Sequence, residues 1–178
     1  MTKVGGSNAD PSHIVRNTRN TLHLFITAEV GLATALGGYE GLAVQQDLLK
    51  GMRAGDVASY KEQLETLKVI HVSASAEIDK KIAENAKIDA AQKRLAGKSM
   101  GQYVKGLVAA KMLVQSIQEL VKTPKKISSN PWAVLYASTE VPSVLTKGVT
   151  SMSALIKYLS ANGVDTSGAQ KAAVELGT

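Results

Sequence analysis

The sequence VASYKEQLETLKVIHVSASAEIDKKIAENAKIDAAQKRL, residues 57 to 95, repeats its seam side chains in steps of three and four as far as Ile82, and then at Ile88 and Leu95. Charged residues of both signs fill most of the positions between them. The seam, which resembles that of a coiled coil, consists of Val57, Tyr60, Leu64, Leu67, His71, Ala74, Ile78, Ile82, Ile88 and Leu95. This spacing predicts one solvated helix of about forty residues, roughly 60 Å long, with one buried seam.

Helical spacing continues on both sides of this stretch, and no segment alternates in the manner of a β-strand. Gly97 is expected to end the long helix, and Ser99 to cap the next one. That next helix is apolar over more than half of its circumference, which is typical of a helix at the centre of a bundle. Besides residues 57–95, the predicted helices are residues 14–36, 39–53, 99–123, 132–161 and 166–176.

These patterns predict an all-α protein, built as an antiparallel up-and-down bundle of four to five long helices. The chain has 178 residues, of which 44% are hydrophobic but only 4% aromatic, so the core is expected to be aliphatic. Residues 11–178 are expected to form one domain, and the small, polar residues 1–10 a flexible N-terminal segment. The pattern leaves open whether Gly37-Gly38 forms a hairpin or a kink.

Several kinds of chemistry are excluded by residue type and spacing. Without cysteine, the chain has no disulfide, thiolate metal site or cysteine nucleophile. None of His13, His23 and His71 follows a glutamate by three residues, as a di-iron bundle requires. No catalytic, cofactor-binding or metal-ligating set is therefore predicted. Residues 1–10 lack the apolar core of a signal peptide, so the chain is either cytoplasmic or exported with its signal peptide removed.

Three titratable residues are candidates for function. Glu29 lies on the apolar side of the first helix, and Glu40 follows eleven residues later, close to the same face if the helix is continuous. Buried carboxylates can serve acid/base chemistry or hold a cation, but acids at such positions more commonly pair with a polar group of a neighbouring helix. His71 occupies a seam position, where a hydrogen-bonded neutral imidazole is the expected state.

The positive charge is concentrated in residues 93–126, which hold eight basic residues and one acidic residue, a net charge of +7. Lys125 and Lys126 lie beside a proline-rich connection that ends at Trp132, an unusual residue to place without a packing partner. The basic residues form no stripe and are not interleaved with aromatic residues. No dedicated nucleic-acid site is therefore predicted.

The resulting expectation is a non-enzymatic helical bundle that works through protein–protein contacts, as an adaptor, a structural subunit or an exported interaction module. The expected contact is either with a protein partner or with further copies of the chain. Two alternatives remain. One is a carrier or pore-related protein that contacts lipid, although residues 24–44, which are long enough to span a bilayer, carry Glu29 and Glu40. The other is an enzyme that uses Glu29, Glu40 or His71.

Overall fold

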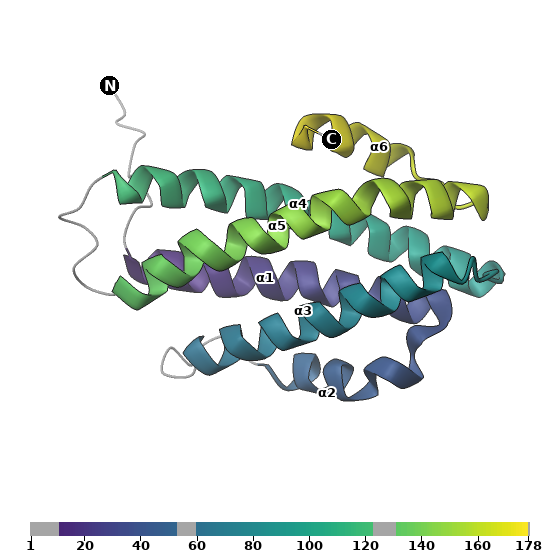
Figure 1. Cartoon of the computed structure of the whole chain (residues 1–178), viewed down its shortest axis with the longest axis horizontal. Helices are drawn as coiled ribbons and strands as arrows, with labels where there is room; N and C mark the ends of the chain where they lie inside the picture. The colour runs from purple at the N-terminus through teal and green to yellow at the C-terminus, as the bar shows by residue number, and fades with distance from the viewer. Residues whose placement is uncertain (1–10, 53–59, 123–130, 178) are drawn as a thin grey trace, which may run out of the picture.

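A computed structural model of the chain describes residues 11–52, 60–122 and 131–177, and within them it is helical without a strand. The all-α prediction is confirmed for this part of the chain. In chain order the elements are α1 (Pro11–Ala33), the π-helical turn η1 (Thr34–Gly38), the 3-10 turn η2 (Glu40–Leu42), α2 (Ala43–Gly51), α3 (Tyr60–Ala83), α4 (Ala90–Val121), α5 (Pro131–Ala161) and α6 (Ser167–Leu176) (Figure 1).

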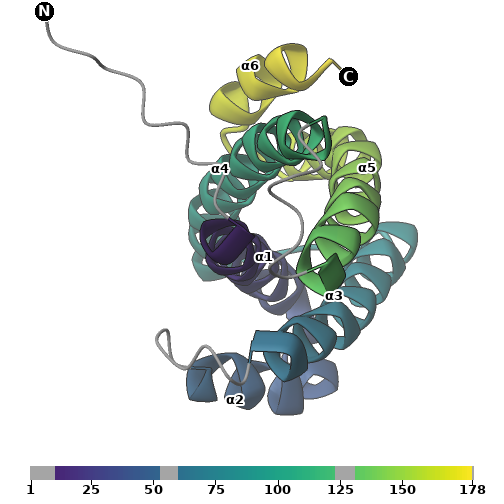
Figure 2. The same ribbon diagram turned by 90° about the vertical axis from the view of Figure 1, so that its left-hand side faces the viewer.

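Four long helices, α1, α3, α4 and α5, lie side by side, and the shorter α2 and α6 lie on opposite outer sides of them (Figures 1 and 2). α1 packs against α3, α4 and α5 and carries fully buried side chains such as Phe25 and Leu32. α4 instead leaves the large apolar side chains of Met112 and Val121 exposed. The central helix is therefore α1. The apolar content of the sequence instead favoured the predicted helix at residues 99–123 for that position.

The directions of the long helices differ from a simple up-and-down bundle. α1, α3 and α5 run in one direction and α4 in the other (Figure 1). α1 and α3 are neighbours that run parallel, because the short α2 carries the chain back along the outer side of the molecule. The predicted antiparallel arrangement therefore does not describe the contact between α1 and α3.

The prediction of a forty-residue helix across residues 57–95 is wrong. α3 ends at Ala83 and α4 begins at Ala90; the longest helix in the described residues has 32 residues. Asn85 turns the chain with a left-handed φ of 47°. Asp89 and Gln92 then form a capping box, in which each side chain accepts a hydrogen bond from the backbone N–H of the other residue. The predicted start at Val57 lies outside the described residues.

Gly97 and Ser99, expected to separate two helices, both lie inside α4. Their small size serves close packing instead. Ser99 is buried against Gly31, where an added Cβ would come within 2.8 Å of the Ser99 Oγ. An added Cβ at Gly97 would contact the Val164 side chain at 3.5 Å. The same small residues occur at helix crossings and at helix ends, so the sequence alone did not separate the two cases.

Gly37-Gly38 forms a hairpin. Gly37, inside the π-helical turn after α1, has a φ of 94°, a conformation that favours glycine. An added Cβ at Gly38 would lie 2.8 Å from the backbone oxygen of Ala33 and 2.6 Å from Cγ of Glu77 on α3, so this position favours glycine for its small size. After this turn α2 runs back along α3 (Figure 1).

The C-terminal part agrees more closely with the sequence. The helix predicted at residues 132–161 is α5 (Pro131–Ala161), and Pro142 lies inside it. The short final helix predicted at residues 166–176 is confirmed as α6, which the left-handed Gly177 ends.

Candidate functional site

Glu29 of α1 and His71 of α3 meet inside the bundle. Their side chains are hydrogen-bonded, with 2.7 Å between Oε2 of Glu29 and Nδ1 of His71. Only 2% of Glu29 and 8% of His71 is exposed to solvent. Two residues that the sequence singled out separately, 42 positions apart, therefore form one buried polar pair.

The pair lies where all four long helices approach one another. Phe25, one turn before Glu29, places its ring centroid 6.0 Å from that of His71 and 4.8 Å from that of Tyr103 on α4. The Tyr103 hydroxyl donates a hydrogen bond to the Gly148 carbonyl of α5, with 3.0 Å between the oxygens. Aromatic rings and a second interhelical hydrogen bond thus surround the pair.

Burial controls the electrostatics of the site. Removal from water raises the pKa of Glu29, and the hydrogen bond from His71 acts in the opposite direction. Lys147 and Asp79, which form an ion pair at 2.8 Å, act on the Glu29 pKa in opposite directions. Burial and the nearby carboxylate charges also raise the pKa of Tyr103 well above its usual range.

The surroundings of the pair favour a structural role over a chemical one. None of the four cavities described in these parts of the chain is lined by Glu29 or His71. Among the described residues, no three His, Asp or Glu side chains cluster in a way that could hold a metal ion. The pair joins α1 to α3 at a fixed register, because each buried side chain is the hydrogen-bond partner of the other.

The raised pKa of Glu29 predicts a pH-dependent difference between the wild type and Glu29→Gln. The folded chain holds the Glu29 proton to higher pH than the unfolded chain, whose ordinary value is 4.5. The stability that this proton contributes is complete below that value and is lost as the pH rises through the folded pKa. The free energy of unfolding of the wild type, relative to the variant, should therefore fall in urea titrations as the pH rises above the ordinary value of 4.5. A difference that is constant or grows with pH would contradict this assignment.

Glu40 is not part of the pair. The hairpin at Gly37 interrupts the helix that would have brought Glu40 to the face of Glu29, and Glu40 is exposed in η2. The helix is not continuous through Gly37-Gly38, so the condition under which the two carboxylates would share one helical face is not met.

Trp132, at the start of α5, has packing partners. It packs against the buried Val15 and Tyr60, and its ring centroid lies 5.3 Å from that of Tyr136. The Lys61 ammonium lies over the ring, 5.4 Å from the centroid. Trp132 thus joins α1, α3 and α5 near one end of the bundle.

Lys125 and Lys126, the remaining candidates, lie outside the described residues, as does the predicted flexible segment at residues 1–10.

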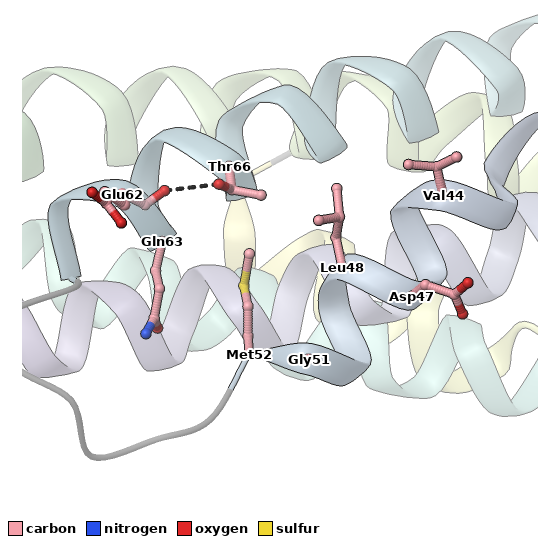
Figure 3. A pocket seen from close by; sticks show the side chains of 8 residues that line it. All are labelled: Val44, Asp47, Leu48, Gly51, Met52, Glu62, Gln63 and Thr66. Carbon is pink, nitrogen blue, oxygen red and sulfur yellow. Dashed lines mark hydrogen bonds between the residues drawn. The ribbon is translucent and has the colours of Figure 1, made fainter.

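A groove between α2 and α3 is a feature that the sequence reading missed (Figure 3). It is open to solvent and has a volume of about 570 Å³. Val44, Leu48 and Met52 line it from the α2 side, and Gln63 and Thr66 line it from α3. Val44 is 67% exposed although it is apolar. Spacing gives one signal for this groove, because Val44 and Leu48 lie four residues apart, on a face of α2 distinct from the one that buries Leu49.

Acidic side chains stand on both walls of the groove. Asp47 belongs to α2 and Glu62 to the first turn of α3, and no basic residue is among those that line the groove. Asp47 makes one exposed ion pair with Lys50, at 3.7 Å. Such a pair contributes little in water. The groove is therefore an apolar surface with an acidic rim.

One segment of the described residues, Ile14–Gly38, is long and apolar enough to cross a bilayer. More than half of its most apolar window is buried against the other helices, as expected for the central helix of this fold.

Comparison of the chain with protein-family models, with curated proteins and with solved structures found no match. A functional interpretation therefore depends on the buried pair and on the groove described above.

Proposed function

We propose that this chain is a non-enzymatic helical bundle that acts through protein–protein contact, and that the groove between α2 and α3 receives an amphipathic helix of its partner. The observation that carries this proposal is the apolar groove itself, with Val44 and Leu48 left exposed at its edge. Exposed apolar side chains in a groove between two helices are the surface to which an amphipathic helix binds through its apolar face.

The charge at the rim specifies the kind of helix. Asp47 and Glu62 stand on opposite walls, so lysine or arginine residues flanking the apolar face of a bound helix would face opposite charge. α2 has nine residues, a length of about 13.5 Å, which is enough for two to three turns of a bound helix. The partner is therefore a short, basic, amphipathic helix.

A synthetic peptide tests this proposal. The probe is an amphipathic helix with leucines at i, i+3, i+4 and i+7 and lysines on both sides of that face, followed by fluorescence anisotropy. We expect binding to the wild type, at least about tenfold weaker binding to Val44→Glu, and weaker binding of a peptide in which glutamates replace the lysines.

Leu135→Glu provides the matched control, because Leu135 is also an exposed apolar residue but belongs to α5 and does not line the groove. It should bind the peptide as the wild type does. A peptide that does not bind the wild type, or that binds Val44→Glu equally well, would overturn the proposal.

A further inference from the structure

A separate cavity lies between α4 and α5, two helices that pack against each other. It is partly open to solvent and has a volume of about 380 Å³, within the range of about 300 to 1,000 Å³ that is usual for small-molecule sites. Val114, Ile117 and Val121 line it from α4. Ala137 and Pro142 line it from α5. The walls of this cavity are therefore mainly apolar.

Pro142 leaves a hydrogen-bond acceptor in the wall of the cavity. Proline has no backbone N–H, so the carbonyl group of Ser138, four residues earlier in α5, lacks the helical hydrogen bond that residue 142 would otherwise donate. Ser138 and Pro142 both line the cavity, and residues four apart lie on one face of a helix. The Ser138 carbonyl, which points along α5 toward Pro142, is therefore part of the cavity wall.

The other polar groups at the cavity determine which ligand charge is accepted. The Ser138 hydroxyl already donates to the Leu135 carbonyl, with 2.9 Å between the oxygens, so only its lone pairs remain. Gln118 and Val121 belong to the last turn of α4, the negative end of the helix dipole. The exposed Lys122 stands beside them. The carbonyl groups oppose an anion and the Lys122 ammonium opposes a cation, which favours a neutral ligand.

We infer that this cavity binds a small, neutral, apolar molecule that carries one N–H or O–H donor. The apolar body displaces water from the aliphatic walls, and the donor forms a hydrogen bond with the Ser138 carbonyl. A ligand without a donor would displace water from that carbonyl and leave it without a partner, which costs binding energy. The site lies on a different pair of helices from the groove between α2 and α3, so this inference does not depend on the proposed function.

Indole is the probe, because it has a single N–H on a compact apolar ring system. 1-Methylindole is the matched ligand, since it keeps the rings and lacks the donor. In an NMR titration of the whole chain, we expect indole to shift the backbone amide signals of residues 114–122 and 137–141 to saturation. 1-Methylindole should bind about fivefold more weakly. Equal affinities for the two compounds, or shifts confined to other segments, would overturn the inference.

Pro142→Ala tests the acceptor. Alanine supplies the missing N–H to the Ser138 carbonyl and favours the helix, so the variant is expected to fold, and a urea unfolding transition establishes this. Its affinity for indole should fall about fivefold, to the level of 1-methylindole, whose own affinity should not change. Equal losses for both compounds, or no loss for either, would overturn recognition through this carbonyl.

Val121→Asn tests the location of the site. Val121 lines the cavity from α4 and is 48% exposed. The substitution should weaken the binding of both compounds about fivefold, because it removes part of the apolar wall. Leu95→Asn is the matched control, since Leu95 is 43% exposed on the same helix and does not line the cavity. It should leave both affinities unchanged. Equal effects of the two variants would indicate general adsorption to apolar surface and overturn the site.

Discussion

Glu29→Met should lower the free energy of unfolding by about 3 kcal/mol, and the double variant Glu29→Met with His71→Leu should recover most of that loss. Methionine keeps the volume of the glutamate side chain but leaves Nδ1 of His71 buried without its partner at 2.7 Å. Removal of one member of a buried pair costs the desolvation of the other, whereas replacement of both by apolar groups removes that cost.

Urea unfolding at neutral pH, followed by circular dichroism, measures both variants. The His71→Leu single variant completes the cycle and gives the coupling energy between the two side chains. Losses that simply add would show that the pair does not act as a unit. A Glu29→Met chain as stable as the wild type would mean that the buried carboxylate contributes nothing to the fold, and a direct functional role for it would then be the better interpretation.

Gly106→Ala should lower the free energy of unfolding by about 2 kcal/mol, although alanine is the better helix former. A Cβ added to Gly106 of α4 would lie 2.8 Å from Cα and 2.9 Å from Cβ of Phe25 on α1. Because the first of these atoms belongs to the backbone, α1 and α4 would have to move apart. That movement would also disturb the ring of Phe25 against Tyr103.

Gly101→Ala is the matched control. Gly101 lies in the same helix, and a Cβ added there meets nothing within 4 Å. Alanine should therefore raise the free energy of unfolding by about 0.5 to 1 kcal/mol, through helix propensity alone. Opposite signs for the two glycines in thermal or urea unfolding are the expected result. Equal stabilisation by both substitutions would show that α1 and α4 do not approach as closely as described.

The helices were predictable from spacing, but their ends were less so. The predicted seam continues through residues 84–89 because Ile88 is buried in the turn itself, although the step from Ile82 to Ile88 is six residues and breaks the period of three and four. The true signal was the capping box at Asp89 and Gln92, a short polar motif that the longer apolar pattern outweighed. Gly97 and Ser99 led to the opposite error, since they predicted a boundary inside a continuous helix. Their small size reflects helix packing and not a helix end.

The site was predictable only residue by residue. Spacing placed Glu29 and His71 on apolar faces of separate helices, but their pairing depends on the register of α1 against α3. That register follows from the hairpin at Gly37 and from α2, whose path along the outer side of the bundle no local pattern specifies. The groove between α2 and α3 was missed for the same reason, since it exists only after the two helices are placed together.

The central position of α1 has a consequence for the order in which the chain can fold. α1 is synthesised before α3, α4 and α5, yet its buried face, with Phe25 and Leu32, is covered only when all three have been made. The contacts between α1 and α5 span more than a hundred residues of sequence, and contacts so distant slow folding. During synthesis the apolar face of α1 therefore stays exposed to water until α5 has left the ribosome. In that interval the chain needs protection from aggregation.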